Sequence, residues 1–434
     1  MNKSYFYSIL RHVKNPNRWS FCKKPSGLAL AQLLPNFFLR KNAEKSDNGN
    51  LVLSSVTGFK GVYLFATARM GLFWLLKNRG IGVGDRVVLQ AFNCAVVPDA
   101  VIKTGATPVF VDIQSVSLTP SLELIKESIS DLNVKALVVQ NSFGFLNNHD
   151  VIAIRKHRPD ILLILDSSLS FTLDSDIWKE YREFDGVMLS FDISKPVSII
   201  SGGAMLLPEE LKSDRDSYIS VPPLNKLVEK YLMNRLRVIY ILGDHDGIQS
   251  LVDYLLTGVK KFFSSSTKFI GFLEGAIHPL EWSSQYSYPS KMPDRFVLIL
   301  GNKLSTWTEE EAVKRTFAQF VIKFLRSRGS LDLLPMQYVE NSDRWVPLRI
   351  PLLVDKKRLF IKTWGNDYRI DQWWFSEPII SCYEMEEFGY KTSSCREAEN
   401  IGEKIINFPV PCSYRDLGNY KLGFERLIDR IKNV

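Results

Sequence analysis

Apolar runs alternate with amphipathic segments along the chain between residues 51 and 205. The amphipathic segments carry apolar side chains at helical spacing, at residues 70–78, 98–104, 121–130 and 150–157. Short, continuously apolar runs lie between them, at residues 86–89, 108–111, 136–139, 161–165 and 186–189. Runs of this kind are typical of strands buried on both faces of a parallel sheet. Because they alternate with helices, we predict βαβ units and an α/β fold with a mostly parallel sheet.

The rest of the chain shows other patterns. Residues 206–295 look mainly helical, with residues 224–242 as the longest segment, while residues 296–434 mix helical and strand-like segments. We therefore predict an N-terminal extension over residues 1–50, a large domain over 51–295 and a smaller C-terminal α+β domain over 296–434. In the C-terminal part, strands are expected at residues 295–300 and 358–363, and helices at residues 309–327, 397–406 and 417–431.

Composition and charge exclude several classes of protein. The formal net charge is +8, but the basic residues are spread along the chain, which indicates a solvated surface and no nucleic-acid partner. The five cysteines show no CxxC spacing and the five histidines no metal-ligand spacing, so no disulfide framework and no metal site are expected. We recognise no membrane span and no signal peptide, and therefore expect a cytoplasmic protein.

An acidic residue stands at the end of the apolar run at residues 161–165. Functional side chains in open α/β sheets gather at the carboxyl ends of the strands, and Asp166 has this position. The ordinary structural role of such an aspartate is to cap the next turn or helix. Taken alone, Asp166 favours that ordinary role.

The next apolar run leads to Ser190 and Lys195, and Gly202 and Gly203 follow. Singly, these residues indicate a surface lysine and a turn. Together with Asp166 they form the pair that pyridoxal chemistry requires, a carboxylate at one strand end and a lysine after the next strand. The carboxylate keeps the pyridinium nitrogen protonated, while the lysine forms the Schiff base and later serves as general base.

A third element is the start of the helix predicted at residues 70–78. Thr67 and Ala68 precede this helix, and Arg69 would add positive charge. A helix N-terminus presents free N–H groups and the positive end of the helix dipole, which suits a phosphate group. The alternative is an ordinary capped helix start.

The order of these segments resembles the DegT/DnrJ/StrS family of pyridoxal-phosphate-dependent sugar aminotransferases. The closest stretch is residues 65–112, with GIGVGDRVV followed by AFNCAVVPDAVIKTGATPVFVDI. LDSSLS stands where the family has EDAAQA, and SFDISK matches the family motif SFxxxK. CREAENIGEKIINFPVP resembles a C-terminal segment of the family. The resemblance covers about residues 61–205 and returns at residues 345–431.

This resemblance implies a fold-type-I pyridoxal enzyme that binds pyridoxal 5'-phosphate and forms a homodimer. It implies that Lys195 is the Schiff-base lysine and Asp166 the partner of the pyridinium nitrogen. The positions that match the family's phosphate-binding residues are Thr67, Ala68, Arg69 and Ser190.

Three features depart from the family pattern. Leu169 stands where the family has a glutamine near the phenolic oxygen of the cofactor, and a leucine cannot donate a hydrogen bond. That oxygen would then find its partner elsewhere, for example at Asn93, or remain solvated. Cys94 stands where an aromatic residue often stacks on the cofactor ring. Residues 206–295 lack the segment by which family dimers usually reach the phosphate of the partner.

The activity that the resemblance implies is transfer of an amino group from an amino acid, with glutamate as the expected donor, to a keto sugar. The sugar is expected to be nucleotide-linked, in the biosynthesis of cell-surface polysaccharides or natural products, so the expected partners are small molecules. One alternative keeps the cofactor and changes the reaction; Lys195 argues against the dehydratase branch of the family, in which histidine replaces this lysine. Another alternative, favoured by Leu169 and Cys94, is a non-catalytic binding or scaffold protein.

Overall fold

The computed structural model describes eight parts of the chain: residues 48–147, 150–192, 195–199, 201–226, 229, 288–364, 375–380 and 384–433. The N-terminal extension predicted at residues 1–50 lies outside the described residues except for its last three positions. Most of the helix expected at residues 224–242 also lies outside them. Within the described residues, no helix is long and apolar enough to cross a membrane.

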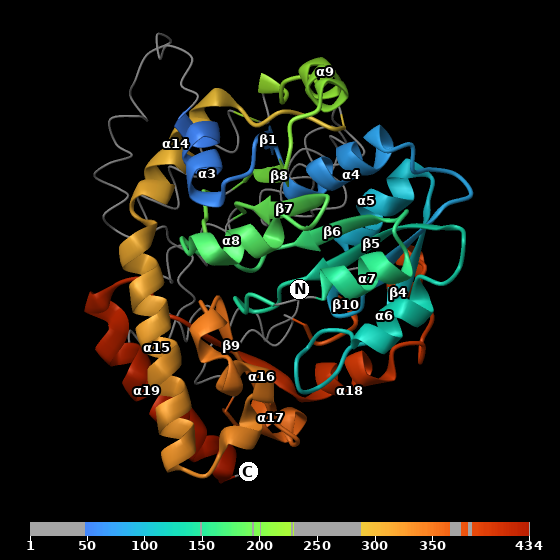
Figure 1. The fold of residues 1–434 in the computed structure, drawn as a ribbon. Coiled ribbons are helices and arrows are strands. Elements are labelled where there is room, and N and C mark those ends of the chain that lie inside the picture. Colours follow the sequence, from blue (N-terminus) through green and yellow to red (C-terminus); the bar gives the residue numbers. More distant parts are fainter. Residues whose placement is uncertain are drawn as a thin grey trace, which may run out of the picture.

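A seven-stranded sheet forms the centre of the described structure, with the strand order β1-β8-β7-β6-β5-β2-β4 (Figure 1). The pairs β6–β7, β5–β6, β2–β5 and β2–β4 are parallel, whereas β8 pairs antiparallel with both β1 and β7. This arrangement confirms the mostly parallel α/β fold. The strands are β1 (Gly61–Phe65), β2 (Arg86–Gln90), β4 (Thr107–Val111), β5 (Val134–Gln140), β6 (Leu162–Asp166), β7 (Gly186–Ser190) and β8 (Gly203–Leu207).

The five strands predicted between residues 86 and 189 are confirmed, and β1 and β8 are additional. The four predicted helices are also confirmed, as α4 (Ala68–Asn78), α5 (Val96–Thr104), α6 (Leu122–Ser128) and α7 (Val151–His157). Helix α4 packs on β1, β7 and β8 and against α5. The helices α3 (Asn48–Thr57) and α8 (Ser175–Tyr181) contact each other, and α3 also lies beside α14 (Asp294–Ser305) (Figure 1).

Two strand predictions in the C-terminal part are wrong. Residues 295–300 belong to helix α14, and residues 358–363 belong to helix α17 (Lys357–Trp364). In α14, Phe296, Ile299 and Leu300 are buried, so the apolar run faces the core at helical spacing. Short apolar runs do not distinguish a buried helix from a strand, because both periodicities fit a few residues.

The other C-terminal helices agree with the prediction except at one end. Helices α15 (Trp307–Ser327) and α19 (Tyr414–Lys432) confirm the expected segments. The helix expected at residues 397–406 is α18 (Arg396–Lys404), which ends earlier because Ile405 and Ile406 belong to strand β11 (Ile405–Pro409). Strand β11 pairs antiparallel with β9 (Arg349–Leu353). The hydrogen bonds between these strands satisfy the backbone groups of Ile405 and Ile406, which a longer helix would otherwise have satisfied.

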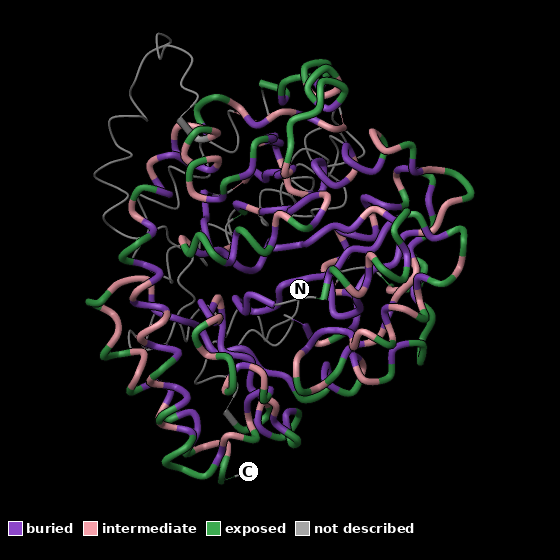
Figure 2. Tube along the Cα trace, in the orientation of Figure 1, coloured by how far each residue is buried: buried purple, intermediate pink, exposed green. Residues whose placement is uncertain are grey.

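Buried apolar side chains form two clusters. The first lies around the central sheet and includes residues of α3, α4, α8 and α14. The second joins α15, α19, β9 and β11 to loops that follow β2, β5 and β6, including Phe92, Phe143 and Leu169. Figure 2 shows buried residues along the central strands and exposed residues on the outer sides of the helices. The second cluster therefore covers loops at the carboxyl ends of the parallel strands, where functional residues are expected.

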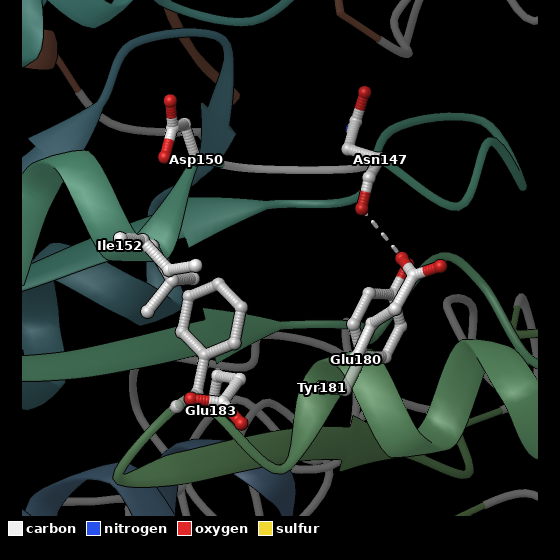
Figure 3. Close-up of a pocket in the computed structure, with 8 residues that line it drawn as sticks. Asn147, Asp150, Ile152, Glu180, Tyr181 and Glu183 are labelled. Carbon is white, nitrogen blue, oxygen red and sulfur yellow. Dashed lines mark hydrogen bonds between the residues drawn. The ribbon is translucent and has the colours of Figure 1, made fainter.

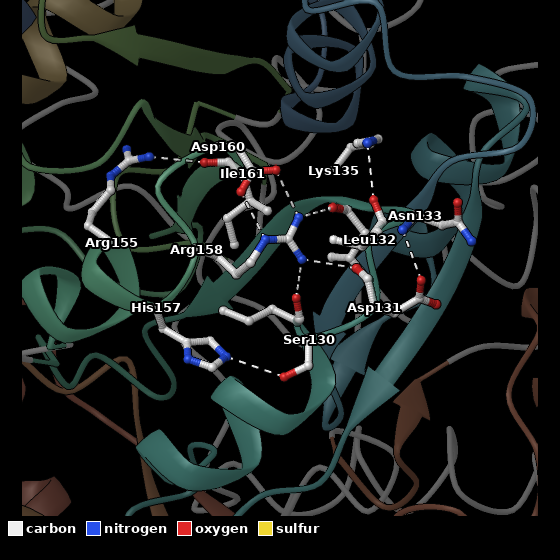
Figure 4. A network of polar contacts seen from close by, with 12 residues as sticks. Ser130, Asp131, Leu132, Asn133, Lys135, Arg155, His157, Arg158, Asp160 and Ile161 are labelled. Carbon is white, nitrogen blue, oxygen red and sulfur yellow. Dashed lines mark hydrogen bonds and ion pairs between the residues drawn. The ribbon is translucent and has the colours of Figure 1, made fainter.

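A polar network fixes the opposite, amino ends of two strands (Figure 4). The buried guanidinium group of Arg158 donates hydrogen bonds to the backbone oxygens of Asp131 and Val134, each at 3.0 Å. It also donates to Asp160, and this pairing lowers the pKa of the Asp160 carboxyl group to about 2. The connections into β5 and β6 are thereby held together, which supports the strand that delivers Asp166.

Candidate active site

Asp166 is the last residue of β6 and only 3% of it is exposed. Burial raises the pKa of its carboxyl group, while the backbone N–H of Ser168, at 2.9 Å from Oδ1, and the positive charge of Lys195 oppose that rise. A buried carboxylate is costly unless a cation or hydrogen bonds compensate it. Asp166 therefore suits a cationic partner at the carboxyl edge of the sheet.

Lys195 follows β7, the neighbour of β6 in the sheet. Its backbone N–H donates to the oxygen of Asp192 at 3.0 Å, and its side chain is partly buried. Its charge opposes the rise in the pKa of the Asp166 carboxyl group, as the smallest of the effects on that group, so the two residues lie within electrostatic reach of each other. Within the described residues, its ammonium group has no hydrogen bond and no ion pair, which leaves this group available for a ligand.

The N-terminus of α4 lies next to this pair because of the double glycine. Ser190 pairs with Gly203 in the sheet, and a β-carbon at Gly203 would lie 2.3 Å from the backbone N and Cα of Ala68. Thr67 forms a backbone bridge with Gly202. Only glycine permits this approach. The structure thus brings together three of the residues predicted to bind phosphate, namely Thr67, Ala68 and Ser190.

Arg69 is the second residue of α4 and is buried, at 5% exposure. Its Nε and Nη1 atoms have no hydrogen-bond partner. The hydroxyl group of Thr67 is also unpartnered and forms no cap to the helix. The start of α4 therefore holds unused donors, as expected of a site that binds an anion.

Cys94 and Asn93 form the short strand β3, which pairs in parallel with β10 (Ile379–Ile380) of the C-terminal part. The side-chain oxygen of Asn93 accepts from the Cys94 N–H at 2.7 Å, but its Nδ2 is buried without an acceptor. Cys94 is a free, partly buried thiol. No contact shown for the described residues joins Cys94 directly to Asp166 or Lys195, so its role beside the cofactor stays a prediction.

Three phenylalanines pack together around this strand end. Phe92, Phe143 and Phe375 have φ values of 69°, 52° and 61°, which are rare for bulky residues. The ring centroids of Phe375 lie 5.1 Å from Phe92 and 4.9 Å from Phe143. Strained backbone of this kind persists only where surrounding packing holds it, and often lies at functional sites. The loops after β2 and β5 are therefore firmly seated against the C-terminal part.

Leu169 lies in the loop after β6 and is buried in the second apolar cluster, with the same phenylalanines. This packing explains why a leucine occupies the position, because the amide of a glutamine would be buried within an apolar cluster. Its predicted place near the phenolic oxygen of the cofactor stays a prediction.

Unpartnered polar atoms provide a test of whether these residues fit the cofactor. Buried polar atoms normally have partners, and those that lack one indicate a missing water, ion or ligand. Among the residues with such side-chain atoms, Thr67, Arg69, Asn93 and Ser198 lie within the predicted site segments or three residues from Lys195, while others, such as Asn50 and Gln337, lie elsewhere. Hydroxyl, amide and guanidinium groups suit a phosphorylated, oxygen-bearing ring compound, so the residues present fit pyridoxal phosphate.

The sequence interpretation missed two features of this site. Ser198 was not singled out, although its position between Lys195 and the double glycine was a usable signal. The backbone contacts of Gln140 and Asn141 with Asp166 were also missed: Gln140 pairs with Asp166 in the sheet, and the backbone N–H of Asn141 donates to the backbone oxygen of Asp166 at 2.9 Å. Gln140 and Asn141 directly follow the apolar run at residues 136–139, and this position at the end of a predicted strand could have indicated them.

A separate surface pocket of about 380 Å³ lies between the start of α7 and the end of α8 (Figure 3). Asp150, Glu180 and Glu183 give it an acidic lining, and the Tyr181 hydroxyl donates to the backbone oxygen of Asn147 at 3.2 Å. Glu180 is paired with Arg344. None of the predicted site residues lines this pocket, so it is not part of the candidate active site.

Comparisons with known proteins agree with the resemblance found in the sequence. Residues 50–232 match the model of the DegT/DnrJ/EryC1/StrS aminotransferase family. The spore coat polysaccharide biosynthesis protein SpsC of Bacillus subtilis is 23% identical over 179 residues, which cover 40% of this chain and 44% of that protein. The dTDP-4-amino-4,6-dideoxy-D-glucose transaminase of Shigella dysenteriae is 23% identical over 204 residues, with coverages of 45% and 55%. The chain thus spans about half the length of these curated relatives.

Solved structures show the same fold. NtdA from Bacillus subtilis with bound cofactor PMP has a TM-score of 0.63 at 15% identity, covering 100% of this chain and 83% of its own. DesV from S. venezuelae in complex with a ketimine intermediate has a TM-score of 0.62 at 14% identity, with coverages of 94% and 93%. At these identities the likeness establishes the fold, and the expected α/β architecture is confirmed.

Proposed function

We propose, from the match of residues 50–232 to the model of the DegT/DnrJ/EryC1/StrS aminotransferase family, that the protein is a pyridoxal-phosphate-dependent aminotransferase. It transfers the amino group of an amino acid, with glutamate as the proposed donor, to a nucleotide-linked keto sugar. The product serves the biosynthesis of a cell-surface polysaccharide or natural product. The observation that carries this proposal is the buried Asp166 at the carboxyl end of β6, with Lys195 following the neighbouring strand β7.

The residues that would hold the cofactor lie on four adjacent segments. Asp166 would face the pyridinium nitrogen, and its burial away from water strengthens that charge pairing. Thr67, Ala68, Arg69 and Ser190 would bind the phosphate group. Cys94 and Leu169 would lie against the ring, Cys94 through its thiol and Leu169 through apolar packing. When bound, pyridoxal phosphate supplies an electron sink that makes removal of a proton from an amino acid feasible.

Lys195 has two tasks in this proposal. Its amine would hold the cofactor at the cofactor's carbonyl carbon, and as a neutral amine it would take up and return a proton. The negative charge of Asp166 would keep the positive charge of the ring in place during this transfer. The loops around Phe92 and Phe143 would exclude water from one side of the site, because both side chains are fully buried.

The same family match supports a proposal for the oligomeric state and the cellular location of the protein. We propose a homodimer in the cytoplasm whose partners are small molecules, namely an amino donor and a keto sugar, with no nucleic acid. Size-exclusion chromatography with light scattering would test the dimer.

The central experiment is chemical labelling of Lys195. Purified protein is incubated with pyridoxal phosphate, reduced with borohydride, digested and mapped. We expect a pyridoxyl label on Lys195, and none in a Lys195→Arg variant that keeps the charge. A label on another lysine would contradict the assignment. Transfer from glutamate is then measured with nucleotide-linked keto sugars.

A second candidate is a non-catalytic scaffold on the same fold. Two observations favour it: Leu169 is buried among apolar side chains, and Cys94 offers no ring to stack on a cofactor. The absorbance spectrum separates the candidates, because a Schiff base with pyridoxal phosphate is yellow. A protein that is colourless after incubation with excess cofactor and removal of the unbound cofactor would favour the scaffold.

A further inference from the structure

The loop that follows Asp166 contains three buried serines, Ser167, Ser168 and Ser170. Two of them bind the framework of the loop. The Ser167 hydroxyl donates to the backbone oxygen of Ser170 at 3.1 Å, and the Ser170 hydroxyl donates to the backbone oxygen of Phe145 at 3.3 Å. The Ser168 hydroxyl differs from both, because it is buried without a hydrogen bond of normal geometry in the described part of the chain.

The nearest use for the Ser168 hydroxyl is the carboxylate of Asp166. The backbone N–H of Ser168 already donates to Oδ1 of Asp166 at 2.9 Å, so the two residues are in contact. Burial is the largest effect on the Asp166 carboxyl group and raises its pKa, whereas the hydroxyl and the backbone N–H of Ser168 lower it. A buried donor that lacks an acceptor therefore lies beside a buried acceptor that gains from each donor.

The surroundings of Asp166 leave room for a second hydrogen bond. A carboxylate has about four lone-pair positions, and the backbone N–H of Ser168 occupies one of them. The neighbours of Asp166 in the sheet, Gln140 on β5 and Met188 on β7, are uncharged. Among the described residues, Lys195 is the charged group that acts on Asp166, and its effect is smaller than that of Ser168.

We propose that Ser168 is a positioning residue whose hydroxyl, by rotation about the Cα–Cβ bond, donates a hydrogen bond to the Asp166 carboxylate and keeps it charged and oriented. A hydrogen bond to the ionised form of a carboxyl group favours that form. The role toward a cationic ring nitrogen rests on the proposed function, but the contact between the two side chains does not need the cofactor. The family motif EDAAQA has alanine at this position, so the contact is not part of the family pattern.

The first test uses the protein without cofactor and measures urea unfolding as a function of pH. The raised pKa of Asp166 means that the folded chain binds more protons than the unfolded chain between the two pKa values, so the free energy of unfolding falls as pH rises through this window. Ser168→Ala should extend this fall to higher pH. Ser170→Ala, which removes a hydroxyl group of the same loop, should not. In Asp166→Asn, adding Ser168→Ala should leave the pH dependence unchanged.

The second test measures dissociation constants of pyridoxal phosphate at pH 8 and pH 6. The ratio of the constant of Ser168→Ala to that of the wild type should rise about three- to tenfold as the pH falls, because protonated Asp166 no longer pairs with a cationic ring nitrogen. Titration of the phosphate group of the cofactor cancels in this ratio. Ser168→Thr keeps a hydroxyl group and should bring the ratio back toward one.

A wild-type pH dependence of unfolding in Ser168→Ala would overturn the inference, as would a ratio of dissociation constants that does not change with pH. Equal effects of Ser168→Ala and Ser170→Ala would overturn it too, because the loop as a whole would then be responsible. If pyridoxal phosphate binds neither to the wild type nor to the variants, but Ser168→Ala alone shifts the unfolding curve, the proposed function fails and the contact with Asp166 stands.

Discussion

At the scale of single residues, buried charged groups carry most of the chemistry of this protein. Asp166 and Arg69 are both buried, and two side-chain nitrogen atoms of Arg69 have no hydrogen-bond partner. Most buried charges elsewhere serve packing, as Arg158 does by binding three backbone oxygens. This contrast separates the residues of the site from the residues of the framework.

Asp166→Asn should abolish most of the activity while the protein stays folded. The asparagine keeps the size of the side chain but removes the charge that would hold the ring protonated, so turnover should fall at least about 100-fold. Steady-state kinetics of amino transfer, with circular dichroism for folding, provide the measurement. Asp176→Asn is the control, because Asp176 is an exposed carboxylate on α8. Near-normal turnover of Asp166→Asn would refute its role.

Lys357 should make stability depend on pH in the alkaline range. Burial lowers the pKa of this lysine to about 8, although its amine donates to the Gly402 oxygen at 2.7 Å. In the unfolded chain it titrates near an ordinary value of about 10.4. Between these two pKa values the unfolded chain binds more protons, so the free energy of unfolding rises with pH, by at most about 3 kcal/mol.

Urea unfolding of the wild type and of Lys357→Met between pH 7.5 and 9.5 tests this prediction. The variant should lack the rise in unfolding free energy. Equal slopes for the two proteins would show that Lys357 is not the group responsible. Measurements above about pH 10 are not useful here, because tyrosines then begin to ionise.

At the scale of elements, the contact between α4 and β8 decides whether the site forms. Strand β8 begins at Gly203, directly after Gly202, which has a φ of 123°. The absence of a side chain at Gly203 lets the start of α4 approach the sheet. Taken singly, the double glycine indicates a turn, and the apolar pattern does not predict the strand that follows it. Its role in the site comes from the packing between α4 and β8, which no local pattern shows.

Gly203→Ala should displace the start of α4. The new methyl group would lie 2.3 Å from backbone atoms of Ala68, so either element must move, which costs roughly 1–3 kcal/mol. Cofactor affinity should fall at least tenfold, since the donors of α4 move with the helix. Gly418→Ala, in α19 with open space around it, should be neutral or stabilising by about 1 kcal/mol. Cofactor titration and thermal unfolding measure both effects. Wild-type affinity in Gly203→Ala would contradict this account.

At the scale of the whole molecule, helix α15 ties the C-terminal part to the loop that follows Asp166. The carboxylate of Glu311 accepts hydrogen bonds from the Thr172 hydroxyl at 2.7 Å and the Leu173 N–H at 2.9 Å. It also accepts from the indole N–H of Trp307 and pairs with Arg315. These contacts hold the loop that contains Ser168 and Leu169, so the site depends on residues that are more than a hundred positions away in the chain.

Glu311→Ala should destabilise the whole protein and loosen the site. Several buried donors would lose their acceptor, at a cost on the order of 3 kcal/mol. Glu309→Ala removes an exposed carboxylate of the same helix and should change little. Urea unfolding gives the difference in stability, and the cofactor titration shows whether the loop after β6 has moved. An unchanged unfolding free energy in Glu311→Ala would refute this role.

Sequence patterns alone predict the parallel strands, the helices between them, the positions of Asp166 and Ser190 at strand ends, and that of Lys195 shortly after a strand. This was possible because a buried strand must be continuously apolar, and because a polar residue that interrupts such a run marks the end of that strand. The family resemblance then assigned chemistry to residues whose separate roles looked ordinary. The errors at residues 295–300 and 358–363 arose where a short apolar run fits a helix and a strand equally well.

Which of these residues meet, and which lack a partner, depends on how the chain packs in three dimensions. The pairing of Ser190 with Gly203, the approach of Gly203 to Ala68 and the seating of Leu169 among phenylalanines all join distant segments. Burial and hydrogen-bond satisfaction are properties of the packed chain, so the unpaired guanidinium of Arg69 could not be recognised from a local pattern. Sequence patterns indicate which side chains are buried, whereas packing determines which buried polar groups have no hydrogen-bond partner within the protein and can bind a ligand.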